Sequence, residues 1–96
     1  MDSSTNQKIA IVTGSSTGIG YETSLTLARN GFLTYATMRN LNKAENIKSV
    51  ATKENLPVHI QQLDVTDDVS VKNAIQTISS ETGGRIDVLV NSRLWT

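Results

Sequence analysis

The sequence predicts an α/β fold, a doubly wound parallel β-sheet of four strands in the order 3-2-1-4 with three helices. Short apolar or β-branched segments alternate with longer segments in which apolar residues recur every three or four positions. Each helix-like segment stands between two strand-like segments, which implies parallel pairing through right-handed crossovers. A glycine-rich turn follows the first strand, at the point where such a sheet reverses its strand order.

The first half of the pattern predicts a strand, a helix and a second strand. Residues 9–13 (IAIVT) form a continuous apolar run, typical of a strand that is buried on both faces of a parallel sheet. A second strand is expected over 32–37 (FLTYAT), where β-branched and aromatic residues gather. Between them, 19–30 predicts a helix that ends at Asn30-Gly31 and has one face formed by Ile19, Thr23, Leu27 and Ala28.

The second half repeats this alternation. A more exposed helix is expected over 42–54, with Ala44, Ile47, Val50 and Ala51 among many polar positions. Pro57 closes that connection, and 58–63 predicts the third strand. The third helix begins at N-cap candidates in 66–68, continues to Ser80 and has its apolar face at Val71, Ala74, Ile75 and Ile78. Gly83-Gly84 ends it, and 86–90 (IDVLV) predicts the fourth strand.

The composition limits what the chain can do. Its 96 residues suffice for one small domain. Nine basic and nine acidic residues give a formal net charge of zero, which argues against nucleic acid or an anionic membrane as a partner. The absence of cysteine excludes disulfides and thiolate metal sites. The start of the chain is too polar for a secretion signal or a membrane span, so we expect a cytoplasmic protein.

The turn T-G-S-S-T-G-I-G at 13–20 carries the strongest functional signal. Glycine lets the backbone approach a diphosphate closely, and the helix behind the turn directs its free N–H groups and positive dipole end at the same place. The dinucleotide-binding fingerprint is usually G-x-G-x-x-G, and Gly14, Gly18 and Gly20 give a variant spacing. An ordinary Gly/Ser turn is the alternative. The absence of a lysine after the glycines disfavours a P-loop NTPase.

Arg39 indicates which dinucleotide would bind. NAD-binding proteins of this type place an Asp or Glu at the end of the second strand, where it accepts hydrogen bonds from the ribose 2′-hydroxyl. Here Met38-Arg39-Asn40 stands there, with no acid before Glu45. A guanidinium binds a 2′-phosphate through bidentate charge-assisted hydrogen bonds. The sequence therefore favours NADP(H) over NAD(H), and a solvated loop arginine is the alternative.

Three further polar or apolar positions fall where strands end. Asp64 and Val65 follow the third strand, so the carboxylate could accept from an adenine amino group while the valine packs against the ring. An Asp that caps the following turn is the alternative. Asn91 ends the fourth strand and could hold a loop over a cofactor, or be a simple turn residue. His59 has no second His, Cys or carboxylate placed to share a metal, so we interpret it as a packing or surface residue.

Four segments together resemble the short-chain dehydrogenases/reductases. They are T-G-S-S-T-G-I-G at 13–20, Y-A-T-M-R-N at 35–40, L-D-V at 63–65 and I-D-V-L-V-N at 86–91. The resemblance implies a Rossmann-type dinucleotide-binding half-domain over 8–91, between a polar tail at 1–7 and a tail at 92–96 that departs from the family.

The resemblance also implies binding positions. The diphosphate and adenosine-ribose loop matches Gly14, Ser16, Thr17, Gly18, Ile19 and Gly20. Arg39, with Ser16, matches the 2′-phosphate site of NADP-preferring members, and Asp64 and Val65 match the adenine pocket. Asn91 matches the first Asn of the family's Asn-Asn-Ala-Gly segment.

The family pattern stops after Asn91, where Ser-Arg-Leu-Trp-Thr replaces Asn-Ala-Gly. The family's catalytic Ser and Tyr-x-x-x-Lys pair lie beyond this point, so no residue of the chain matches a catalytic position. We expect a truncated or frameshifted product that supplies the NADP(H)-binding portion of an oxidoreductase acting on an alcohol or carbonyl substrate. Two alternatives stay open: an NADP(H)-binding module without turnover, and an interaction fragment that pairs through the open edge of its fourth strand.

Overall fold

The computed structural model describes residues 7–16 and 18–91, over which strands and helices alternate. The strands are β1 (Ile9–Thr13), β2 (Leu33–Met38), β3 (Val58–Gln62) and β4 (Val88–Asn91). The α-helices are α1 (Gly18–Arg29), α2 (Glu45–Glu54) and α3 (Asp68–Thr82), and a 3-10 turn, η2 (Leu41–Lys43), precedes α2. No helix within the described ranges is long and apolar enough to cross a membrane.

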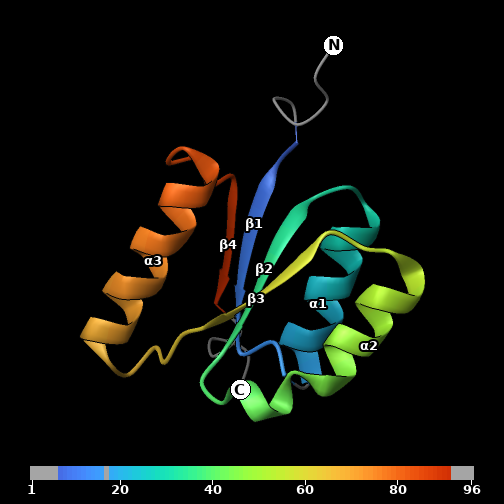
Figure 1. Ribbon diagram of the computed structural model, residues 1–96, viewed down its shortest axis with the longest axis horizontal. Helices are drawn as coiled ribbons and strands as arrows, with labels where there is room; N and C mark the ends of the chain where they lie inside the picture. The colour runs from blue at the N-terminus through green and yellow to red at the C-terminus, as the bar shows by residue number, and fades with distance from the viewer. Residues whose placement is uncertain (1–6, 17, 92–96) are drawn as a thin grey trace.

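The four strands form one parallel sheet in the order β3-β2-β1-β4. Helices α1 and α2 cover one face of this sheet, and α3 covers the other (Figure 1). The register aligns Ile11 of β1 with Tyr35 of β2 and with Leu89 of β4. The doubly wound α/β fold and the strand order expected from the sequence are therefore confirmed.

The sheet separates two hydrophobic clusters because successive side chains of a strand point to opposite faces. One cluster lies between the sheet and helices α1 and α2, with buried members Leu25, Ala36, Met38, Ala44 and Ile47. The other lies under α3, with buried members Ile9, Ile11, Tyr35 and Ile78. All five residues of β1 are buried, as its continuous apolar run indicated.

The helices end where local sequence signals indicate. Asp67 caps α3 by accepting hydrogen bonds from the backbone N–H groups of Val69 and Ser70. Gly83 follows the helix in the left-handed conformation at a φ of 70°. Asn55 ends α2 in the same conformation, at a φ of 56°.

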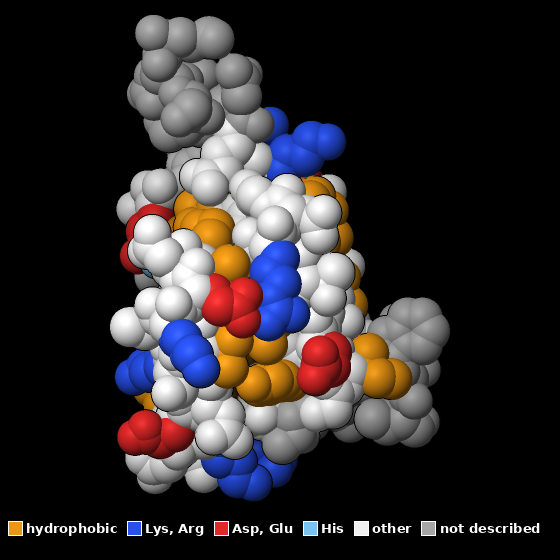
Figure 2. Space-filling model, turned by 90° about the vertical axis from the view of Figure 1, so that its right-hand side faces the viewer, with side chains coloured by type: hydrophobic (Ala, Val, Ile, Leu, Met, Phe, Trp, Pro, Cys, Tyr) orange, Lys and Arg blue, Asp and Glu red, His pale blue; other side chains and the backbone are white. Residues whose placement is uncertain are grey.

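Helices α1 and α2 are joined by an ion pair at their C-terminal ends. Arg29 donates from Nε to Glu54 Oε1 at 2.9 Å and from Nη2 to Glu54 Oε2 at 2.7 Å. This bidentate hydrogen bonding raises the pKa of Arg29 and lowers the pKa of Glu54. Figure 2 shows the side of the molecule on which α1 and α2 lie, where acidic and basic side chains are interspersed with small exposed hydrophobic areas.

Several details differ from the sequence-based expectation. Helix α2 begins at Glu45 rather than at residue 42, because a 3-10 turn precedes it, and α3 continues to Thr82 rather than ending at Ser80. The buried face of α1 consists of Gly20, Ser24, Leu25 and Ala28, whereas Ile19 is 51% exposed. The helix is rotated this way because Gly20, the smallest residue, lies against the end of β1 and leaves its neighbour Ile19 outside. Strand β4 begins at Val88 rather than at residue 86, after the turn that follows α3.

Asp87 forms hydrogen bonds that join the first residue of β1 to the segment before β4. These lie at the N-terminal ends of the strands, opposite the glycine turn. The Ile9 N–H donates to Asp87 Oδ2 at 2.8 Å, and the Asp87 N–H donates to the Ile9 carbonyl at 2.9 Å. Arg85 Nε also donates to Asp87 Oδ2, at 3.1 Å. The backbone hydrogen bond from Ile9, aided by Arg85, lowers the pKa of Asp87 below its usual 3.8.

Because the pKa of Asp87 is lower in the folded state, we expect the free energy of unfolding to decrease as the pH falls into the acid range. The group's contribution is present at neutral pH and is lost as the pH falls below about 3.8 through the lower pKa of the folded state. Urea midpoints measured from pH 6 to pH 2.5 should therefore fall less steeply for Asp87→Asn than for the unaltered chain. Glu22→Gln, which also removes one exposed acid, is the matched control; equal acid slopes for all three chains would contradict the assignment.

Candidate functional site

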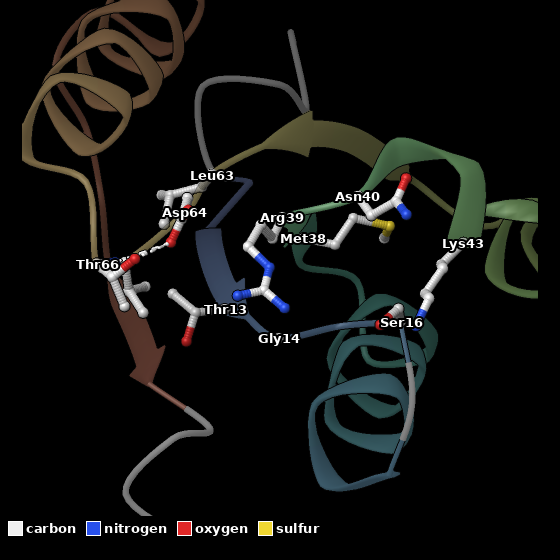
Figure 3. A pocket seen from close by; sticks show the side chains of 11 residues that line it. Thr13, Gly14, Ser16, Met38, Arg39, Asn40, Lys43, Leu63, Asp64 and Thr66 are labelled. Atoms are coloured by element: carbon white, nitrogen blue, oxygen red, sulfur yellow. Dashed lines mark hydrogen bonds between the residues drawn. The ribbon is translucent and has the colours of Figure 1, made fainter.

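A pocket of about 350 Å³ opens at the edge of the sheet where the strands end. It is bounded by the turns that follow β1, β2 and β3 (Figure 3). Its lining residues are Thr13, Gly14, Ser16, Met38, Arg39, Asn40, Lys43, Leu63, Asp64, Val65 and Thr66. Parallel strands bring their C-terminal turns to one edge, so residues far apart in sequence share this pocket.

The glycine turn forms one wall and has two unusual backbone requirements. Gly14 and Gly18 both have a φ of 62°, in the left-handed region that favours glycine. At Gly20 the requirement is space, since a Cβ there would overlap the carbonyl oxygen of Gly14 and lie 2.9 Å from that of Thr13. The start of α1 thus contacts the end of β1 backbone to backbone.

The turn after β2 brings two cations to the pocket. Figure 3 shows the Arg39 guanidinium between Thr13 and Gly14, and the Lys43 ammonium on the side of Ser16. The backbone carbonyl of Arg39 accepts a hydrogen bond from Gln62 Nε2 at 3.2 Å, which ties this turn to the end of β3. The β2 side of the pocket is therefore basic and carries no carboxylate among its lining residues.

The turn after β3 contributes Asp64, whose carboxylate stabilises its own loop. Asp64 Oδ1 accepts from the Thr66 N–H at 3.0 Å and from the Thr66 hydroxyl at 2.6 Å (Figure 3). The Asp64 N–H donates to Ser70 Oγ at 2.9 Å, which connects the turn to α3. The turn-capping role that was the alternative for this residue is thus observed.

Asn91 lies beside the glycine turn through its pairing with Thr13. The Thr13 hydroxyl donates to Asn91 Oδ1 at 3.1 Å and lies 3.4 Å from the carbonyl oxygen of Val90. These contacts hold the end of β4 against the start of the turn. Asn91 is not among the residues that line the pocket.

Comparison with known proteins assigns this fold and glycine turn to a family. The chain matches the model of the short chain dehydrogenase family over residues 8–93, which is most of its length. It belongs to that family. Enzymes of the family bind a nicotinamide dinucleotide, so the pocket lies in a protein lineage whose cofactor has two phosphates and an adenosine.

Three similar proteins illustrate the relationship. The oxidoreductase YusZ of Bacillus subtilis is 42% identical over 89 residues, covering 91% of this chain and 31% of YusZ. The structure of a hydroxysteroid dehydrogenase from Escherichia coli is 25% identical with a TM-score of 0.80, covering 94% of this chain and 39% of that one. The structure of YwfH, an NADPH dependent reductase involved in bacilysin biosynthesis, is 33% identical with a TM-score of 0.77, covering 86% of this chain and 35% of that one. The chain spans about a third of each.

Within this short-chain dehydrogenase fold, the pocket brings together half of the sequence-predicted site residues. Gly14, Ser16, Arg39, Asp64 and Val65 line it. Gly18, Ile19, Gly20 and Asn91 lie outside the lining, on or beside the glycine turn, and Thr17 falls outside the described residues. The structure adds Lys43 and Asn40, which the sequence analysis missed. Lys43 stands four residues after Arg39 in the same short turn, and this nearness in sequence is the signal that could have found it.

Two aromatic-ring residues lie away from this pocket, on the α3 face. Tyr35 is buried and its hydroxyl donates to Glu81 Oε1 at 2.9 Å. Burial and then this hydrogen bond raise the pKa of Tyr35 to about 12, so its phenol stays protonated. His59 is exposed, with its ring 5.3 Å from that of Tyr35. Over residues 7–16 and 18–91, no three His, Cys, Asp or Glu side chains gather as a metal site.

We expect Gly20→Ala to distort the glycine turn, because backbone atoms of Gly14 and Thr13 occupy the space that the new methyl group needs. Overpacking of this kind costs about 1–3 kcal/mol of unfolding free energy, measurable by urea denaturation. Gly84→Ala is the control, since an added Cβ there meets open space and only the φ of 85° strains it, whereas Gly20 lies in α1 without a positive φ. A smaller loss of stability for Gly20→Ala than for Gly84→Ala would contradict this explanation.

Proposed function

We propose that this chain is the cofactor-binding portion of an NADP(H)-dependent oxidoreductase that transfers a hydride between an alcohol and a carbonyl compound. The observation that carries the proposal is the pair of cations, Arg39 and Lys43, on the β2 side of a pocket formed beside the glycine turn. A 2′-phosphate distinguishes NADP(H) from NAD(H), and it requires positive charge where an NAD site has a carboxylate.

The glycine turn would receive the diphosphate. Its left-handed glycines and the N-terminus of α1 provide backbone N–H donors and a positive dipole end, which favour a phosphate anion. The residues assigned to this role are Gly14, Ser16, Thr17, Gly18, Ile19 and Gly20. Thr17 is included from the sequence alone.

Arg39 and Lys43 would bind the 2′-phosphate from two sides. A guanidinium such as that of Arg39 offers two parallel N–H donors, whereas the Lys43 ammonium acts as a point charge from the other side. The Ser16 hydroxyl, on the same wall as Lys43, can add a neutral donor. This arrangement attracts a doubly charged 2′-phosphate strongly, whereas an uncharged 2′-hydroxyl would gain much weaker interactions from the same side chains.

The turn after β3 and the last residue of β4 would complete the adenosine side. Val65 is half-buried in the pocket wall and can pack against the adenine ring. Asp64 holds its turn through Thr66, so its contribution to adenine is one of shape as well as hydrogen bonding. Asn91 supports the glycine turn through the Thr13 hydroxyl rather than from within the pocket.

When bound, the dinucleotide would supply or accept the hydride, and this chain's residues would hold and orient it. The NADPH dependent reductase YwfH, which is 33% identical, supports the NADP(H) assignment. An NADP(H)-binding module without turnover is the second candidate, because the residues that line the pocket would have roles in dinucleotide binding alone. Assay of the 96-residue chain for oxidation of NADPH with carbonyl compounds would distinguish the two.

The two cations make a specific prediction for cofactor choice. Arg39→Ala should raise the Kd of NADPH about 10- to 100-fold, because a hydrogen bond to a charged group is worth about 1.5–3 kcal/mol. Lys43→Ala should raise it about 3- to 10-fold, with an effect that shrinks at high salt. Neither substitution should change the Kd of NADH by more than about twofold, since NADH lacks the 2′-phosphate. Titration of dinucleotide fluorescence measures all of these constants.

Lys48→Ala is the control, because this lysine is exposed on α2 and does not line the pocket. It should leave the affinity for both dinucleotides unchanged. Equal weakening of NADPH and NADH binding by Arg39→Ala would contradict the 2′-phosphate assignment. The lack of saturable binding of either dinucleotide to the unaltered chain would refute the proposed function itself.

A further inference from the structure

Two buried serine hydroxyls, one in the glycine turn and one in α1, contact each other outside the pocket. Ser15 and Ser24 are both fully buried. Their Oγ atoms are 3.0 Å apart; Ser15 Oγ is 2.8 Å from the carbonyl oxygen of Val12, and Ser24 Oγ is 2.8 Å from that of Gly20. This serine bridge therefore connects the end of β1, through Ser15 in the glycine turn, with Ser24 in the second turn of α1.

Each hydroxyl carries one proton, and two proton arrangements satisfy the serine bridge. In the first, Ser24 donates to Ser15, which donates to the Val12 carbonyl. In the second, Ser15 donates to Ser24, which donates to the Gly20 carbonyl. The Thr37 hydroxyl donates to the Val12 carbonyl at 3.0 Å, so that carbonyl keeps a side-chain donor in both arrangements. The strand and the helix stay connected either way.

The position of Ser24 suggests that its hydroxyl acts on the turn rather than on the helix. Alanine has a higher helix propensity than serine, and a serine hydroxyl bonded to the carbonyl four residues earlier slightly destabilises a helix. Burial of a hydroxyl also costs free energy unless it is hydrogen-bonded. What Ser24 gains in return is the contact with Ser15, whose own N–H donates to the Thr37 carbonyl at 2.9 Å.

We propose that Ser24 is a positioning residue for the glycine turn. It cannot touch a ligand, because it is buried and does not line the pocket. Through Ser15 on one side and Gly20 on the other, it fixes the N-terminus of α1 relative to the end of β1. Where the turn binds a dinucleotide, which rests on the proposed function above, this fixes the N–H donors before the diphosphate arrives and lowers the ordering cost of binding.

The test compares Ser24→Ala with Ser80→Ala in the full 96-residue chain. Ser80 is exposed on α3, so its replacement reports the general effect of serine to alanine in a helix. Ser24→Ala should speed amide hydrogen exchange of residues 14–20 at least severalfold while exchange in β3 and α3 stays unchanged. It should also raise the Kd of NADPH about three- to tenfold, the range for one lost hydrogen bond. Ser80→Ala should change neither.

A double-mutant cycle tests the serine bridge directly. Ser15→Ala and Ser24→Ala remove the same contact, so their effects on exchange in the turn should not add, and the double variant should resemble the stronger single one. Additive effects would overturn the proposal. So would faster exchange throughout the chain with an unchanged NADPH affinity, which is the result of a merely structural role.

The role of Ser24 can be tested even if NADPH does not bind or if Ser24→Ala does not fold. If the unaltered chain does not bind NADPH, the proposed function fails, but exchange in the turn of the ligand-free chain still decides whether Ser24 positions it. If Ser24→Ala does not fold, Ser24→Cys replaces it, because a thiol fills similar space and is a weak hydrogen-bond donor. Unchanged exchange over 14–20 in the folded variant would refute the role of Ser24.

Discussion

The backbone contact between the start of α1 and the end of β1 is the constraint on which the rest of the structure depends. Gly20 lies against the carbonyls of Gly14 and Thr13 with no room for a Cβ. That contact rotates α1 so that Ser24, Leu25 and Ala28 face the sheet and Ile19 faces outward. It also aims the N-terminus of the helix at the edge where the strands end, so one steric requirement sets both the packing of the helix and the location of the pocket.

The central position of β1 extends this constraint to the other turns. Because β1 pairs with both β2 and β4, its C-terminal turn lies between the ends of those two strands, and Arg39 and Asn91 come to opposite sides of it. The turn after β2 continues through a 3-10 turn that ends at Lys43. The result is a pocket with a glycine wall, a basic wall and an Asp-stabilised wall, each from a different crossover.

Different interactions stabilise the two ends of the strands, the N-terminal end away from the pocket and the C-terminal end beside it. At the end away from the pocket, Asp87 and Ile9 exchange hydrogen bonds, and Arg85 reinforces the carboxylate. At the pocket end, side chains hold turns: Thr66 with Asp64, Thr13 with Asn91, and Ser24 with Ser15. Stability at the first end depends on the Asp87 charge, which acid removes, whereas the Ser24–Ser15 and Thr13–Asn91 contacts at the second end contain no ionisable group.

The sequence by itself determined the order of strands and helices, the parallel sheet and the glycine turn, because apolar periodicity and glycine spacing reflect local geometry. It also identified Arg39, since that position follows directly from the end of β2. Only the tertiary structure decided that Lys43 shares the pocket, that Ile19 lies outside and that Ser24 contacts Ser15. These facts depend on how closely separate turns approach and on how a helix rotates against a sheet, and packing sets both.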